Sequence, residues 1–363
     1  MKKFFLSLAV FVMALCANAQ TNQYFWYNGN LMMGNPIAQI DSVTFGEGEP
    51  ADTLHILLPR TIIKEVHDTV YIAIHDTVCP NDVPEGALNG VFSVSANKKV
   101  RFSKGNLQYN AALGTHQCAD GTTKQGTWRF AEQQYDTIGR NNIYASSTYN
   151  GWIDLFGWGT SGWNSGANMY EPWSRSYYPS NFIVGGEGLN DLSGNFANAD
   201  WGVYNAIQNG GNQPSLWRTL SKDEAYYLFN TRSHANQLFG YATVNGVKGL
   251  IILPDNWVAP NGIVFTPSIK DFAANIYSLA EWNLISDQAI FLPCASIIVN
   301  TNDFGGDLPG EEVADEGLYW LSTIGNVSTS YHISIRIDNK LDLIGVNYWR
   351  SDGLSVRLVQ DIE

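Results

Sequence analysis

Charged side chains are scarce in this chain, because Asp, Glu, Lys and Arg together make up 15% of its 363 residues, against roughly 25% in an average soluble domain. Basic residues are the scarcest, with 21 against 34 acidic ones, which leaves a net charge of −13. A surface of this charge repels phosphate, so we expect no nucleic-acid partner. The aromatic content of 13% and the 34 glycines favour a folded, loop-rich β protein over a disordered chain.

Long hydrophobic runs are missing except at the N-terminus, so we expect no transmembrane segment. Lys2 and Lys3 precede the apolar stretch 4–15, and Ala17-Asn18-Ala19 has the small residues of a cleavage site. This pattern predicts a signal peptide over residues 1–19, since a bilayer span needs about 20 apolar residues. We therefore expect an exported protein that begins at Gln20 and resides in the periplasm, on the outer surface or outside the cell. Lipidation at Cys16 is the alternative.

Cysteine is also rare, and three cysteines remain after the predicted cleavage: Cys79, Cys118 and Cys294. No two of them form a Cys-x-x-Cys pair, which excludes a zinc ribbon and a thioredoxin-type redox site. The odd count leaves at least one thiol unpaired or in an intermolecular bond. A Cys118–Cys294 disulfide stays open, since the sequence does not show whether the two residues lie close together.

The sequence lacks the motifs of common enzymes, including GxSxG, HExxH, Walker A and the EF-hand loop. Residues 157–162 match GxGxxG formally, but no helical pattern follows and Phe182 stands where a dinucleotide site needs an acid. We assign none of His116, His234 and His332 to a nucleophile–base pair. We therefore expect no enzyme activity, no catalytic residue, no metal site and no cofactor, with a structural calcium ion left open.

The N-terminal part of the mature chain divides into two segments. Residues 20–50 predict a small β-rich segment with a strand at 25–27, a hairpin turn at Asn28-Gly29 and an alternating strand at 40–45. Residues 51–86 predict an extended spacer in which the sequence His-Asp-Thr-Val recurs after eight residues, at 67–70 and 75–78. A metal site at these histidines is the less favoured alternative, because no third ligand is near in sequence. The Asp-(Ser/Thr)-aliphatic triplets in these two segments resemble O-glycan acceptors, at Ser42, Thr53, Thr69 and Thr77.

The patterns of residues 87–363 predict one α+β domain. Two helices are expected after Ser221 and Ser278, because each of these serines stands three residues before a glutamate in a capping-box pattern. The apolar runs 250–253 and 289–292 predict strands that are buried on both faces. Alternating apolar and polar residues at 331–338 and 354–358 predict half-exposed strands. The expected fold combines the two helices with a mainly antiparallel sheet and long loops rich in Gly, Asn and Trp.

A series of motifs in this domain resembles one bacterial family. It starts with Gly151-Trp152-Ile153-Asp154-Leu155-Phe156-Gly157-Trp158-Gly159-Thr160-Ser161-Gly162 and continues, in order, at 198–202, 217–224, 253–257, 291–293, 319–323 and 353–359. These motifs resemble the exported Fibrobacter succinogenes major paralogous domain family, over residues 87–359. The resemblance implies a C-type-lectin-like fold that is distantly similar to that of formylglycine-generating enzymes.

The resemblance leaves three functions open. The first is a cell-surface binding or adhesion module for a glycan or protein ligand. The second is an oxidase like the formylglycine-generating enzymes, which we disfavour because that chemistry needs a pair of late cysteines and only Cys294 lies there. The third is a purely structural surface subunit. The Glu-Pro-Asn and Trp-Asn-Asp motifs of calcium-dependent lectins are absent, and the sequence indicates no oligomeric state.

We predict that a ligand binds to the C-terminal loops and strands, residues 324–352. If Tyr331, Ile333 and Ile335 face the core, the side chains between them face outward, and the stretch 347–352 concentrates residue types found in binding hot spots. The candidate residues are Asn326, His332, Ser334, Arg336, Asn347, Tyr348, Trp349, Arg350 and Asp352. The secondary candidates, in an aromatic loop where more than half of the rings are expected to be core, are Trp152, Trp158, Trp163 and Trp173.

Overall fold

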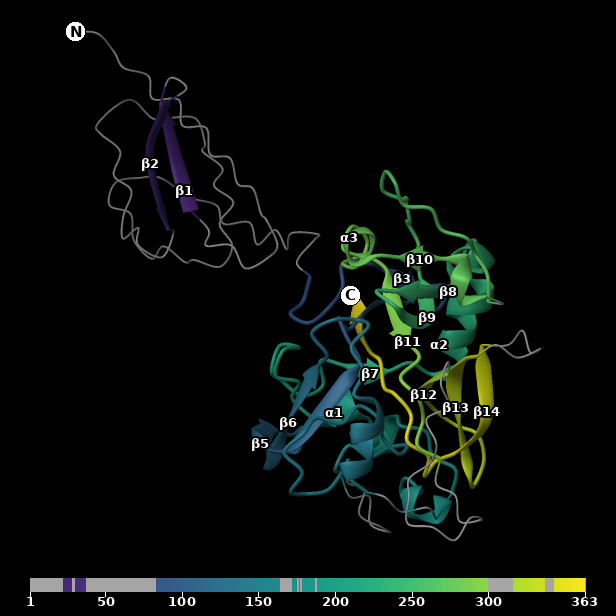
Figure 1. The fold of residues 1–363 in the computed structure, drawn as a ribbon. Helices are drawn as coiled ribbons and strands as arrows, with labels where there is room; N and C mark the ends of the chain where they lie inside the picture. The colour runs from purple at the N-terminus through teal and green to yellow at the C-terminus, as the bar shows by residue number, and fades with distance from the viewer. Residues whose placement is uncertain are drawn as a thin grey trace. The chain divides into compact units, whose positions relative to one another are not determined.

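The computed structural model divides the chain into two compact units, Met1–Asp82 and Val83–Glu363. It describes residues 22–27, 30–36, 83–163, 172–174, 176, 178–186, 188–269, 271–299, 316–336 and 343–362. In the first unit, β1 (Asn22–Tyr27) pairs antiparallel with β2 (Asn30–Pro36), which confirms the predicted hairpin (Figure 1). The predicted signal peptide, the strand at 40–45, the spacer up to residue 82 and the four O-glycan candidates Ser42, Thr53, Thr69 and Thr77 lie outside the described residues.

In the second unit, one sheet joins strands from distant parts of the sequence. β15 (Leu358–Ile362) lies between β4 (Lys99–Phe102) and β7 (Arg218–Thr219) and pairs antiparallel with both. The short strand β3 (Phe92–Ser93) extends the sheet beyond β4. The last strand of the second unit therefore pairs with a strand near the start of that unit.

The two predicted apolar runs are neighbouring strands. β9 (Val247–Ile252) pairs antiparallel with β8 (Phe239–Val244) and with β11 (Ile290–Pro293). β10 (Ile276–Tyr277) adds a parallel edge to β8. The four residues of β11 are all buried, so the prediction of strands covered on both faces is confirmed.

Two further groups of strands complete the sheets of the described residues. β5 (Leu107–Gln117) and β6 (Thr123–Phe130) form a long antiparallel hairpin. β12 (Gly317–Ile324), β13 (Thr329–Ile335) and β14 (Ile344–Trp349) form an antiparallel sheet in that order. In this sheet β13 is central and β14 is an edge strand.

Both predicted helices begin where the capping boxes place them. α2 (Lys222–Tyr226) follows Ser221 and continues as a π-helical turn, Tyr227–Thr231, and α3 (Leu279–Trp282) follows Ser278. The sequence pattern does not predict α1 (Trp201–Tyr204), which is too short to show helical periodicity and is capped by Asp200. Short 3-10 turns lie at Gly139–Tyr144, Pro179–Phe182, Gly194–Ala199, Ala235–Gln237 and Phe272–Ala274.

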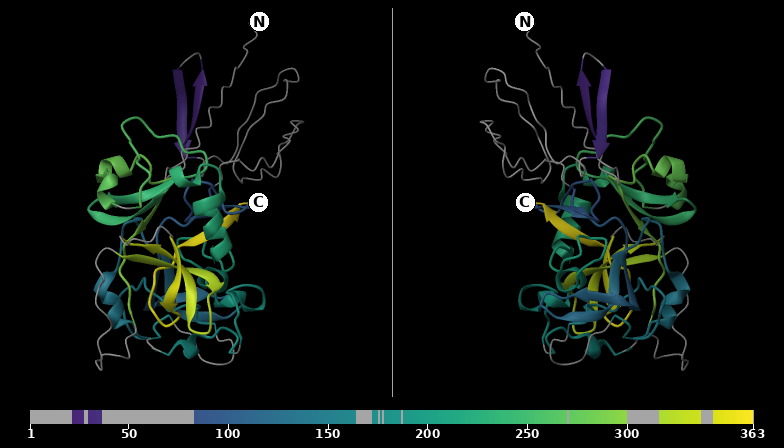
Figure 2. Two further views of the ribbon diagram at one scale, coloured as in Figure 1. Left: turned by 90° about the vertical axis from the view of Figure 1, so that its right-hand side faces the viewer. Right: turned by 90° about the vertical axis from the view of Figure 1, so that its left-hand side faces the viewer.

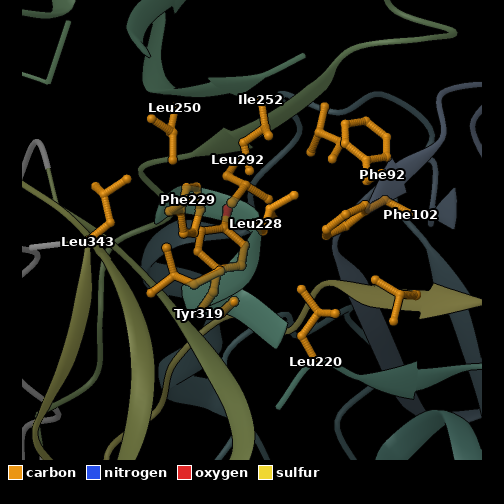
Figure 3. Packing of buried hydrophobic residues seen from close by; sticks show 14 of the residues in the cluster. Phe92, Phe102, Leu220, Leu228, Phe229, Leu250, Ile252, Leu292, Tyr319 and Leu343 are labelled. Carbon is orange, nitrogen blue, oxygen red and sulfur yellow. The ribbon is translucent and has the colours of Figure 1, made fainter. Parts of the chain in front are cut away.

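Buried side chains fill three clusters. In the first cluster, Leu228 and Phe229 of the helical segment point toward Leu250 and Leu292 of the β8–β9–β11 sheet (Figure 3). The second contains the rings of the loop-rich region, with the fully buried Trp128, Trp158, Trp201, Trp217 and Trp320. The third surrounds Trp282 of α3. The loops between β6 and α2 are therefore anchored by aromatic side chains, which bury about 150–250 Å² each.

The segment 354–358 differs from the prediction of a half-exposed strand, because every residue in it is buried. The segment is flanked by two other parts of the chain, which pair with it through the isolated β-bridges Phe156–Leu354 and Tyr319–Ser355. Arg357, one of the two polar residues of the segment, donates hydrogen bonds to Asn106 Oδ1 at 3.1 Å and Gln134 Oε1 at 2.6 Å. Burial lowers the pKa of Arg357 to about 10. Alternation indicates a strand here, but it does not show that the polar face is solvated.

A cluster of ion pairs joins the β15 sheet to α2. Arg218 donates to both carboxylate oxygens of Glu224, at 2.7 and 2.8 Å, and to Asp361 at 2.6 Å. Glu224 also accepts the Ser221 N–H at 2.9 Å and lies 3.1 Å from Lys98 Nζ. Burial alone would raise the pKa of Glu224, but Arg218 and the Ser221 amide outweigh burial and lower it.

Candidate functional site

The predicted binding region consists of β13, β14 and the turn that precedes β13. β14 lies at the outer edge of its sheet in Figure 1. In the left view of Figure 2 the strands of this sheet, in yellow, are drawn in front of the rest of the second unit. The turn and β14 touch, since a Cβ placed on Gly325 would stand 2.4 Å from Val346 Cγ2. Thr329 is the register partner of Trp349. The structure therefore brings residues 325–329 and 344–349 together.

The polar face of β13 is not exposed, which corrects the prediction for His332 and Ser334. His332 is 0% exposed and Ser334 is 6% exposed. On one side of the sheet Ile333 and Ile335 pack in the first core cluster, and on the other side Trp320 packs in the second. A central strand between two cores has no solvent face, whatever its sequence pattern. Arg336, just after the strand, is partly buried.

The outer strand and the turn do carry an exposed surface. Trp349 is 42% exposed, Val346 38% and Val327 66%, and the amides Asn326 and Asn347 are exposed beside them. We call these five residues the β14 surface. Three of them, Asn326, Asn347 and Trp349, are predicted candidates. Sequence reasoning missed Val327 in the turn and Val346 in the strand, because aliphatic side chains are expected in the core.

Arg350 and Asp352 are buried behind this surface, which differs from the expectation that they are exposed beside Trp349. They are 0% and 3% exposed. The Arg350 guanidinium donates to the carbonyls of Phe182, at 3.2 Å, and Val327. Asp352 Oδ2 accepts the Trp349 N–H at 2.8 Å. Asp352 therefore fixes the backbone of Trp349 itself, and Arg350 fixes the backbone of the turn at Val327.

The turn is stabilised in the same way by Asn326, whose Oδ1 accepts the N–H groups of Ser328 at 2.7 Å and Thr329 at 3.0 Å. The Arg350 N–H donates to Ser328 O at 2.9 Å. The backbone that presents the β14 surface is thus held by several hydrogen bonds, which reduces the entropy lost when a ligand binds.

Tyr348 and His332 form a second layer beneath the surface. The Tyr348 ring, half-buried, meets the His332 imidazole edge to face, with centroids 5.1 Å apart, and Trp320 meets the other side of the imidazole at 6.3 Å. His332 Nε2 has no hydrogen-bond partner among the described residues. Burial lowers the pKa of His332 to about 4. The imidazole is therefore neutral at neutral pH.

The secondary candidates in the aromatic loop differ in how deeply they are buried. Trp158 is fully buried and its indole N–H donates to Leu321 O at 2.8 Å, so this ring is part of the core. Trp163 and Trp173 are partly buried against the second core cluster. Trp152 is also partly buried, with the Arg129 guanidinium 3.8 Å from its ring centroid. Of these four indoles, Trp158 is buried and the other three are partly buried.

The described residues contain no group of three His, Cys, Asp or Glu side chains that could hold a metal ion. Cys118 is buried and Cys294 is partly buried against the first core cluster. In the same part of the chain, no helix has the length and apolarity needed to cross a membrane.

No protein-family model, no curated protein and no solved structure matches the chain. The fold class consequently rests on the structure itself, which is mixed α/β with mostly antiparallel sheets and few helices.

Proposed function

We propose that this chain is an exported, cell-surface binding module and that its second unit is a C-type-lectin-like domain with the β14 surface as its ligand-binding face. The signal-peptide pattern at residues 1–19 supports export. The ordered motifs over 87–359 support the lectin-like fold, and the mainly antiparallel α+β architecture is compatible with it.

The exposure of Trp349 carries the proposal. A large ring that is 42% exposed at the end of an edge strand gains free energy when a partner covers it, because apolar area contributes about 25 cal/mol per Å² removed from water. Its backbone is held by Asp352 and by the neighbouring Arg350, so little ordering is needed on binding. Exposed rings on rigid backbone are frequent binding hot spots.

The chemistry of the surface favours an uncharged ligand. The five residues of the β14 surface comprise one indole, two isopropyl groups and two amides, and none of them is charged. An indole stacks against the C–H face of a sugar ring. The Asn347 amide is of a type that both donates to and accepts from hydroxyl groups, and Asn326 offers its N–H₂ group, since its Oδ1 already accepts two backbone N–H groups. We therefore propose a neutral saccharide as the ligand. The oxidase function remains disfavoured, since only Cys294 lies late in the domain.

A glycan array probed with the purified full-length mature chain tests this proposal. We expect a set of neutral glycans that binds equally well with and without EDTA. Trp349→Ala should abolish these signals, and Tyr226→Ala, which removes a ring that is 56% exposed on α2, should keep them.

Two outcomes would contradict the proposal. Glycan signals that survive Trp349→Ala would place the site elsewhere, with Trp152 as the next candidate. The absence of any glycan signal would reject a saccharide ligand. A pull-down in which wild type and Trp349→Ala retained the same proteins would then favour a purely structural subunit.

A further inference from the structure

The imidazole of His332 lies directly beneath the β14 surface, in a position where a proton is difficult to accommodate. It is 0% exposed and lies edge to face between Trp320 and Tyr348. Gly345 is its cross-strand partner on β14, and a Cβ at Gly345 would stand 2.4 Å from His332 Nε2. The strand that carries the binding face therefore rests on this ring.

The surroundings of the ring provide little to stabilise an imidazolium. On β13, the Ser330 carbonyl lies 3.4 Å from Nδ1, and Nε2 has no partner among the described residues. The Ser330 and Ser334 hydroxyls, on either side along the strand, also have no partner there. An unsolvated N–H⁺ without an acceptor is strongly disfavoured, so a protonated ring must reach water.

The charged and titratable groups around the ring do not offset this cost. Arg336, at the end of β13, disfavours the imidazolium by like charge. β12 contributes the uncharged Trp320, and β14 contributes the Tyr348 phenol, whose pKa is raised by burial. Two carboxylates lie nearby, and both have other partners. Glu316 accepts the Tyr348 O–H at 3.4 Å, and Asp352 accepts the Trp349 N–H.

We propose that His332 is a proton-sensitive support of the binding face: uptake of a proton in acid loosens the packing between β13 and β14 and releases the ligand. The release of ligand rests on the proposed function of the β14 surface. The loosening of the strands does not, and it can be measured without any ligand.

The sign and size of the effect follow from linkage. An opened state has a solvated imidazole with the usual pKa of about 6.5, and the packed state has a pKa of about 4. Opening is therefore accompanied by proton uptake, and the packed state loses stability as the pH falls from about 6.5 toward 4. Between pH 7 and pH 5 the opening equilibrium rises about 20-fold.

Melting of the whole protein cannot isolate this effect, because two other buried groups titrate in the same range with the opposite sign. Burial raises the pKa of Asp154 and of Asp200 to about 6. Protonation of these carboxylates stabilises the folded state as the pH falls. A local readout at β13 and β14 is needed instead.

Amide hydrogen exchange of the full chain supplies that readout. After correction for intrinsic rates, we expect the protection of amides in β13 and β14 to fall about 20-fold from pH 7 to pH 5, while β8 and β9 serve as the internal reference. His332→Phe, which keeps an aromatic ring without a titratable group, should remove the pH dependence, and so should His332→Gln. Protection that does not change with pH in the wild type, or that changes equally in both variants, would overturn the proposal.

A direct titration of the wild-type ring by NMR keeps the proposal testable if both variants fail to fold. A His332 pKa well below 6.5 is expected, and a value at or above 6.5 would overturn the proposal. If the strands open in acid but Trp349→Ala does not affect any ligand, the proposed function fails and the proton-sensitive support stands. If the strands stay closed in acid while Trp349→Ala abolishes ligand binding, the proton-sensitive support fails and the proposed function stands.

Discussion

Glu224 allows the contribution of one side chain to the stability of the domain to be worked out from the structure. It closes the capping box at the start of α2 and also accepts two hydrogen bonds from Arg218. Glu224→Ala removes both interactions at once, together with the ion pair to Lys98. The helix end would lose the partner of the Ser221 amide, and the sheet of β7 and β15 would lose its link to α2.

The expected loss is about 3 kcal/mol. A hydrogen bond to a charged partner contributes about 1.5–3 kcal/mol and a helix cap about 1 kcal/mol. The Glu224 side chain is 13% exposed and that of Arg218 is 22% exposed, so solvent screens the pair only in part. Removing one partner of a fully buried pair costs about 3–5 kcal/mol, but here Arg218 keeps Asp361. A loss of this size lowers the melting temperature of a large domain by roughly 5–10 °C.

Glu281 provides the matched control, because it closes the second capping box at α3 while no ion pair to it is found in the described residues. Denaturant unfolding of wild type, Glu224→Ala and Glu281→Ala should give a clearly larger loss for Glu224. The contribution of Glu224 should also disappear in acid: its pKa is below 4.5 in the folded state, so its stabilisation is present above that value and lost as the pH falls through the folded pKa. Equal losses for the two variants would refute a stabilising role of the Arg218 pair.

Two further predictions concern packing and export. Gly202→Ala should destabilise the domain by about 1–3 kcal/mol through overpacking, since the new Cβ would stand 2.6 Å from Trp217 Cβ and 2.8 Å from Leu358 Cδ1; an unchanged melting temperature would show that α1 can shift. Mass spectrometry of the native protein should find an N-terminus near Gln20, and a chain that retains Met1 in the cytoplasm would contradict export.

The parts of the fold that the sequence predicts well are those determined by neighbouring residues. The capping boxes at Ser221 and Ser278 place two helix starts correctly, because cap hydrogen bonds involve residues three positions apart. The apolar run of β9 and β11 also needs no partner to be recognised. In contrast, α1 depends on the cap at Asp200 and on the packing of Trp201. A helix of four residues is too short for its sequence to show helical periodicity.

The candidate site shows where local patterns fail. His332 and Ser334 alternate with aliphatic residues, yet both faces of β13 are covered by segments that are distant in sequence. Arg350 and Asp352 resemble binding residues in composition but serve backbone hydrogen bonds that only the folded turn creates. The exposure of Trp349 does not follow from the sequence alone, because the same residues also suit a ring that covers a sheet edge.

The location of the ligand site is the central claim, and a hydrogen-exchange footprint of the wild-type chain tests it most directly. With a saturating concentration of a glycan selected on the array, we expect new protection at the amides of 325–328 and 344–349. Protection confined to 139–163, the loop that carries Trp152, would contradict the assignment of the β14 surface as the binding face.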